Sequence, residues 1–155
     1  MEEHDLNENE LEQRIHVLRS LRRHLIAQRA KFRSYLDLLE REEQAILSED
    51  VDKLHAQAQM EASIVREITT LQKVIDPLAS LYRTAFPQTE QSIPPLQAGL
   101  ERLKRDVLHK NAHNRMLLKG RMSEIRQEIQ ALRKKKRPLF PIAERETATM
   151  VDIKT

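Results

Sequence analysis

Apolar residues recur every seven positions through the first third of the chain. The repeat consists of Leu11, Leu18, Leu25, Phe32, Leu39 and Ile46. Such spacing places side chains along one face of a helix that can lie against other helices. The intermediate series expected to complete the seam mixes apolar with charged residues, namely Ile15, Arg22, Arg29, Leu36 and Glu43. The pattern predicts one long helix over about residues 6–47, with an imperfect apolar seam.

A turn and a second helix are expected next. Asp50, after Ser48 and Glu49, has a carboxylate that can accept hydrogen bonds from the free N–H groups of a first helical turn. Apolar residues then recur at alternating spacings of four and three, as Ile64, Ile68, Leu71, Ile75 and Leu78. This predicts a helix over about residues 51–86. Pro77 lies inside the pattern and lacks a backbone donor, so we expect a kink there.

A proline-rich loop at residues 86–95 separates this segment from a third helix over about residues 94–137. The third helix has two apolar stripes. The first consists of Leu96, Leu100, Leu103 and Val107, and the second of Leu118, Met122, Ile125, Ile129 and Leu132. Asn111 and Asn114 lie between the stripes. Asparagine in a helical seam sets register or partner choice, whereas on an uncovered face it only meets solvent, and both alternatives stay open.

Composition favours an all-α fold, because the 155 residues include two glycines, no cysteine, no tryptophan and 3% aromatics. We predict three long helices in an elongated antiparallel coiled-coil-like bundle. Residues 1–137 would form one helical domain and residues 138–155 a flexible tail. The first residues show no signal-peptide pattern, and no segment is apolar enough to span a membrane. A cytoplasmic protein without stable membrane insertion is expected.

Candidate chemistry is sparse. His109 and His113 have the spacing of metal ligands on a helix, but the sequence places no third ligand beside them. The carboxylates of residues 40–43 lack an evident cleft that would shift their pKa values. Two glycines, Gly99 and Gly120, cannot build a phosphate-binding loop. We therefore expect no enzymatic activity, no cofactor, no metal and no small-molecule substrate.

A basic run, Arg133-Lys134-Lys135-Lys136-Arg137, closes the third helical segment. Exposed cations of this kind can bind nucleic acid or an anionic membrane. Phe140 is the only nearby aromatic residue that could stack on a base. Cations near a helix C-terminus also complement the helix dipole. A solubilising helix end or a protein-docking patch is favoured over a nucleic-acid site.

The residues support a family resemblance. The pattern Tyr35-x-x-Leu38-Leu39-x-x-Glu42-x-x-Ala45-Ile46-x-x-x-Asp50-x-x-x-Leu54, followed later by Asn111-x-x-Asn114-x-x-Leu117-Leu118 and an amphipathic helix, resembles the FlgN family of bacterial flagellar export chaperones. The similarity extends from about Phe32 to Leu132. A basic residue often present in the second helix of that family is missing, since residues 60–62 are Met-Glu-Ala.

This resemblance implies a cytoplasmic, non-enzymatic chaperone. Such proteins hold hook-associated proteins, the hook–filament junction subunits, through their C-terminal segments, prevent premature assembly, and deliver them to the type III export apparatus through its ATPase complex. Carried onto this chain, the resemblance implies a docking face with register-setting polar contacts on the third helix. The residues are Asn111, Asn114, Leu117, Leu118, Met122, Ile125, Ile129 and Leu132.

Two other functions remain open from the sequence. One is a coiled-coil component of the export ATPase complex, which would ignore cargo peptides. The other is a basic helical regulator that binds nucleic acid through Arg133–Arg137, with an affinity that falls steeply as salt rises.

Overall fold

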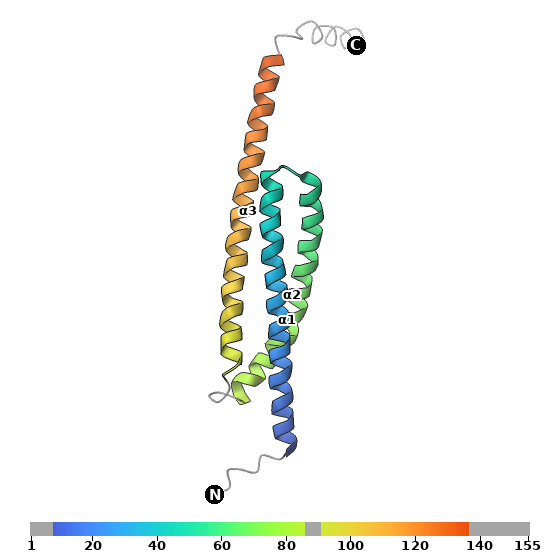
Figure 1. Cartoon of the computed structure of the whole chain (residues 1–155), viewed down its shortest axis with the longest axis vertical. Coiled ribbons are helices and arrows are strands. Elements are labelled where there is room, and N and C mark those ends of the chain that lie inside the picture. Colours follow the sequence, from blue (N-terminus) through green and yellow to red (C-terminus); the bar gives the residue numbers. More distant parts are fainter. Residues whose placement is uncertain (1–7, 86–90, 137–155) are drawn as a thin grey trace, which may run out of the picture. The chain divides into compact units, whose positions relative to one another are not determined.

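The computed structural model describes residues 8–85 and 91–136, and these form three long helices (Figure 1). They are α1 (Glu8–Leu47), α2 (Val51–Ala85) and α3 (Ile93–Lys136). No strand occurs within the described residues, so the predicted all-α class is confirmed. The observed helix ends lie within two residues of the ends that the hydrophobic pattern predicts. The predicted flexible tail, residues 138–155, lies outside the described residues.

The chain divides into two compact units within α3. The first unit is Met1–Asn114, and it contains α1, α2 and the beginning of α3. The second unit is Arg115–Thr155, of which the structure describes the remainder of α3. The predicted docking residues are thus distributed over both units, because Asn111 and Asn114 belong to the first and the six apolar residues to the second.

The α1–α2 connection is a tight turn in which backbone N–H groups bond to carbonyl oxygens of the last turn of α1. The N–H of Asp50 donates to the carbonyl oxygen of Ala45 over 3.0 Å, and the N–H of Glu49 donates to that of Ile46 over 3.2 Å. Glu49 has a φ of 55°, the left-handed conformation that such a helix end requires. Asp50 Oδ1 accepts a hydrogen bond from the N–H of Lys53 over 3.1 Å. The predicted helix-capping role of Asp50 is confirmed.

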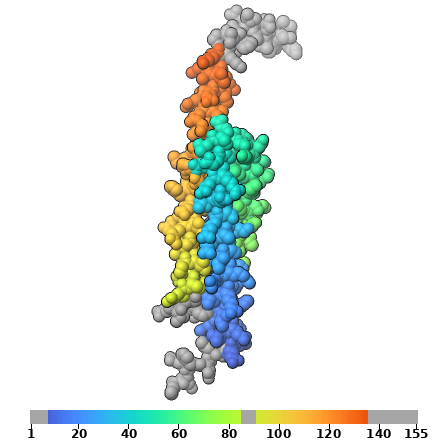
Figure 2. Space-filling view, in the orientation of Figure 1, coloured from blue at the N-terminus to red at the C-terminus, as the bar shows by residue number. Residues whose placement is uncertain are grey.

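In the first unit, α1 lies between α2 and the first part of α3 (Figure 1). The core combines residues of all three helices. Its buried members are Leu21, Leu25, Phe32, Tyr35, Leu39, Ile75, Tyr82, Ile93, Leu100 and Val107. The seven-residue repeat of α1 is buried from Leu25 to Ile46 but not at its start, where Leu11 is 49% exposed. Figure 2 shows the first turns of α1, in dark blue, extending beyond the first turn of α3, in yellow.

The second row of the α1 seam differs from the prediction. Leu21, Gln28 and Tyr35 each stand three positions after a member of the seven-residue repeat, and all three are buried. Arg22 and Arg29 each stand four positions after a member of the repeat, and neither is buried. The choice depends on the direction from which α2 and α3 approach α1, and the spacing within one helix does not determine that direction. The seam is therefore more apolar than the sequence indicates.

Polar residues in this seam have partners on α2. Gln28 is buried, and its Nε2 donates to Gln72 Oε1 over 2.7 Å. The hydroxyl of Tyr35 donates to Glu61 Oε1 over 2.6 Å. Buried polar groups are tolerated when they are hydrogen-bonded in this way, and such pairs favour one register over its alternatives.

Pro77 lies inside α2 without ending it, because the helix continues to Ala85. Figure 1 shows the ribbon of α2 changing direction over its last turns, as expected for a kink near Pro77. A proline removes one backbone hydrogen bond and crowds the preceding turn, which bends a helix without necessarily breaking it.

Among the residues that the structure describes, no helix combines the length and the apolar character that crossing a membrane requires.

Candidate partner-binding face

The second unit presents a row of exposed apolar residues on one face of α3. The spacings alternate between four and three, so the residues share a face of the helix. This apolar stripe consists of Leu118, Met122, Ile125, Ile129 and Leu132, whose exposed fractions range from 39% to 57%. Each of these side chains retains a large part of its surface for contact with another molecule. Five such side chains in succession are unusual on a face that serves only solubility.

Charged residues border the apolar stripe on both sides. Lys119, Arg126 and Arg133 each follow a stripe residue, are seven positions apart, and are exposed; we call this row the basic edge. Within residues 8–85 and 91–136, no ion pair joins any of the three to an acidic side chain. The opposite edge is mixed, with Arg121, Glu128 and Lys135. The stripe therefore has one uniformly cationic border.

The other residues assigned to this face are placed differently. Leu117 precedes the stripe position Leu118 and lies off the stripe; its side chain is half-buried. Asn111 is half-buried, and no side-chain hydrogen bond to another described residue is seen for it. Asn114 is 1% exposed and belongs to the first unit. Its Nδ2 donates to the carbonyl oxygen of Leu39 over 2.8 Å and to Glu42 Oε1 over 3.2 Å.

Asn114 thus joins α3 to α1 inside the first unit. Its Oδ1 is buried and accepts no hydrogen bond from the described residues. Of the two alternatives left open by the sequence, a buried seam position is the one observed for Asn114. A polar residue in a seam fixes the alignment of the two helices, since sliding one along the other would leave both its amide and its acceptor unpaired.

Two neighbouring carboxylates beside Asn114 have opposite electrostatic environments. Partial burial and the nearby carboxylate of Glu61 raise the pKa of Glu42 above its ordinary value of 4.5, and the hydrogen bond from Asn114 offsets only part of this rise. The hydrogen-bonded ammonium of Lys110 lowers the pKa of Glu43, and His113 adds to this effect. The residues of α3 therefore stabilise the ionised form of Glu43, whereas the surroundings of Glu42 destabilise its ionised form.

His113 also belongs to this cluster. Its Nε2 lies 3.8 Å from Glu43 Oε1. No group of three or more potential metal-ligating side chains is found among the described residues. The histidine spacing noted in the sequence is therefore accompanied by an acidic neighbour on α1, not by a third ligand.

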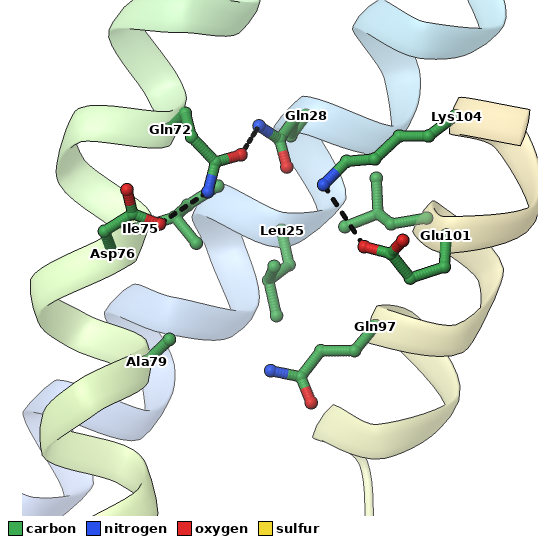
Figure 3. Close-up of a pocket in the computed structure, with 10 residues that line it drawn as sticks. Leu25, Gln28, Gln72, Ile75, Asp76, Ala79, Gln97, Glu101 and Lys104 are labelled. Atoms are coloured by element: carbon green, nitrogen blue, oxygen red, sulfur yellow. Dashed lines mark hydrogen bonds and ion pairs between the residues drawn. The ribbon is translucent and has the colours of Figure 1, made fainter. Parts of the chain in front are cut away.

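A groove of about 200 Å³ lies in the first unit, with α2 and α3 as its walls and Leu25 of α1 between them (Figure 3). Five of its polar side chains, those of Gln28, Gln72, Asp76, Glu101 and Lys104, pair with one another. Gln72 accepts a hydrogen bond from Gln28 and donates one to Asp76 over 2.6 Å. Lys104 pairs with Glu101 over 3.3 Å. Because these groups are mutually satisfied, we assign no ligand to this groove.

Sequence reasoning found the apolar stripe but missed the basic edge. A seven-residue spacing of Lys119, Arg126 and Arg133 is present in the printed sequence. This row of cations can be recognised in the sequence once each charged residue is assigned a heptad position relative to the apolar stripe. The polar pair of Gln28 with Gln72 had no comparable signal, because its two members are 44 residues apart in the chain.

The chain is similar to a bacterial protein. No protein-family model matches it, and no solved structure matches it. A protein of Treponema pallidum (strain Nichols), described as an uncharacterized protein, is 27% identical over 128 residues. The aligned part covers 83% of this chain and 82% of the relative. The similarity therefore extends over most of both chains, and the relative's description names no function.

Proposed function

We propose that this protein is a cytoplasmic chaperone of bacterial flagellar export. It binds hook-associated proteins, the subunits of the hook–filament junction, through their C-terminal helical segments. It keeps them from assembling prematurely and delivers them to the type III export apparatus by way of its ATPase complex. It acts by binding and not by catalysis.

The observation that carries this proposal is the exposure of the apolar stripe. Leu118, Ile125 and Leu132 are 39%, 40% and 57% exposed although they share the spacing of a helix-pairing seam. Removing a leucine or isoleucine side chain from water stabilises a complex by about 1.5–3 kcal/mol. A stripe of this kind is suited to pairing with an amphipathic helix of another protein.

The expected cargo segment complements such a surface. A C-terminal segment that is disordered when free can fold into a helix on the chaperone, and ordering it reduces the net affinity. Reversible capture of this kind suits a carrier that must release its cargo for export. The family resemblance of residues 35–54 and 111–118 supplies the cargo class.

The two asparagines take separate roles in this proposal. Asn114 is buried against Leu39, so we assign it to the alignment of α1 with α3. Asn111 is half-buried and can still offer its amide to a partner. The docking face proper is the apolar stripe, with Leu117 beside it.

A pull-down with C-terminal peptides of hook-junction proteins tests the proposal. Ile125→Asp and Ile129→Asp each place a charge in the stripe, and we expect capture to weaken by roughly tenfold or more, because a charge cannot be buried against the cargo helix without large cost. Met116→Asp is the matched control. Met116 is 75% exposed on the same helix but lies off the stripe, so this change should leave capture within about twofold.

Equal capture by the wild type and both stripe variants would show that the apolar stripe is not the binding site. Failure of every hook-junction peptide to bind the wild-type protein would show that hook-junction proteins are not the cargo. Circular dichroism of each variant checks that the helix content of the protein is the same as in the wild type.

A further inference from the structure

The cations around the apolar stripe are unevenly distributed. Residues 115–136 contain eight Lys or Arg and two Glu. Three of the cations form the basic edge, Lys119, Arg126 and Arg133, at the heptad position directly beside the stripe. In paired helices this position faces charged side chains of the partner and determines which partner is accepted. Unsatisfied cations in such a row disfavour a neutral or basic partner.

We infer that the apolar stripe and its basic edge together select an amphipathic helix of another polypeptide that bears Asp or Glu at seven-residue intervals along its facing edge. This inference rests on the proposed function and specifies the chemistry of the partner. The apolar stripe supplies contact area. The basic edge supplies selectivity and draws an acidic segment toward the face before contact.

A second copy of the chain does not fit the same face. In an antiparallel pair of stripes, Lys119, Arg126 and Arg133 would face their own counterparts, and like charges at these positions repel. In a parallel pair they would face the opposite edge, in which Arg121 and Lys135 are also cationic. Neither orientation of two identical stripes brings the basic edge against a row of acids.

An anionic membrane fits less well than a helix. Helices that lie on membranes have broad apolar faces containing Trp, Phe or Leu. Here the apolar stripe is narrow, with two residues per heptad, and residues 115–136 contain no aromatic side chain. Glu124 and Glu128 lie among the cations of the same segment. A narrow seam with alternating spacings is the pattern of a helix-pairing surface.

The inference can be tested with two synthetic peptides and the full-length protein. Both peptides contain about three heptads with the same leucines at the core positions, and they carry either Glu or Lys at the flanking positions. Fluorescence anisotropy of the labelled peptides measures binding. We expect the Glu peptide to bind at least about tenfold more tightly than the Lys peptide. This preference should shrink between about 0.1 M and 1 M salt, as the Debye length falls from roughly 10 Å to 3 Å.

A charge reversal of the basic edge provides the matching variant. Lys119→Glu, Arg126→Glu and Arg133→Glu in combination should invert the preference, so that the Lys peptide binds better than the Glu peptide. The control reverses Arg102, Arg105 and Lys134, three exposed cations of α3 outside the basic edge. It has the same net charge and should keep the wild-type preference. A non-specific electrostatic attraction would respond equally to both triple variants.

The possible results separate this inference from the proposed function. Equal binding of both peptides, lost in Ile125→Asp, would overturn the inference and leave a purely apolar docking face. The inference would also be overturned if the basic-edge reversal left the capture of hook-junction peptides unchanged. Self-association of the protein that Ile125→Asp abolishes would identify a second copy as the occupant and overturn the inference. Stronger binding to phosphatidylserine vesicles than to the Glu peptide would overturn it in favour of a membrane.

Discussion

Asn114 of α3 donates a hydrogen bond from Nδ2 to the backbone carbonyl oxygen of Leu39 in α1 over 2.8 Å. The contact connects residues 75 positions apart in the chain, and it lies where the sequence pattern of α3 loses its apolar seam. Asn114 is also the last residue of the first unit. Beyond it, the seam spacing resumes with residues that are exposed. The asparagine thus marks the point at which α3 changes from a helix with a buried apolar face into one with an exposed apolar stripe.

The first prediction concerns the stability cost of this asparagine. Asn114→Leu removes a buried amide whose Oδ1 accepts no hydrogen bond from the described residues, so we expect the free energy of unfolding to rise by about 1 kcal/mol. Asn114→Asp should lower it by about 3 kcal/mol or more, since the new charge would be buried beside Glu42. Urea unfolding measures both changes. A loss of stability in the leucine variant would show that the amide contributes more than its desolvation costs.

The second prediction uses the adjacent carboxylates Glu42 and Glu43. A raised pKa means that the folded state binds a proton more tightly than the unfolded chain, so the ionised Glu42 lowers stability above its folded pKa. Glu42→Gln should therefore raise stability at neutral pH, with the gain vanishing as the pH falls below the ordinary value of 4.5. Glu43 has a lowered pKa, so Glu43→Gln should lower stability at neutral pH, and this loss should vanish as the pH falls through the folded pKa of Glu43.

Thermal unfolding from acidic to neutral pH compares these two variants with the wild type. Because the residues are neighbours and the substitutions are identical, a general effect of losing one negative charge would shift both variants in the same direction. Opposite signs at neutral pH are the expected result.

The third prediction concerns the turn after α1. Glu49 has a φ of 55°, a conformation that costs residues with a Cβ about 1–2 kcal/mol relative to glycine. Both Glu49→Gly and Glu49→Ala remove the glutamate side chain, and only glycine also relieves the backbone. We expect the glycine variant to be more stable than the alanine variant by about 1 kcal/mol. Equal stability of the two in chemical denaturation would mean that this turn bears no such strain.

The fourth prediction tests which row completes the α1 seam. Leu21 is 0% exposed, whereas Ile15, which the spacing assigns to the seam, is 40% exposed. Leu21→Ala should cost about 2–5 kcal/mol, because it removes buried methyl groups and leaves a cavity. Ile15→Ala should change the free energy of unfolding by about 0.5 kcal/mol or less. Denaturant titration of the two variants decides between the rows, and similar losses would contradict the structure.

The helices themselves could be predicted almost completely from the sequence. Their periodicity, the capping residue Asp50 and the prolines at positions 94 and 95 act over a few neighbouring residues, so they can be recognised in the chain. The kink near Pro77 is a local effect of the same kind. In contrast, the row through Leu21, Gln28 and Tyr35 was missed, because burial of that row depends on where α2 and α3 lie around α1.

The candidate partner-binding face shows the same division most clearly. Two stripes of α3 have similar spacing, and the sequence by itself determined that both belong to one amphipathic helix. The tertiary structure decided that Leu100 and Val107 are buried in the core while Ile125 and Ile129 are 40% and 45% exposed. Periodicity specifies which side chains share a face, because that follows from the helix geometry. Whether another helix covers that face depends on contacts between distant segments, which no local spacing contains.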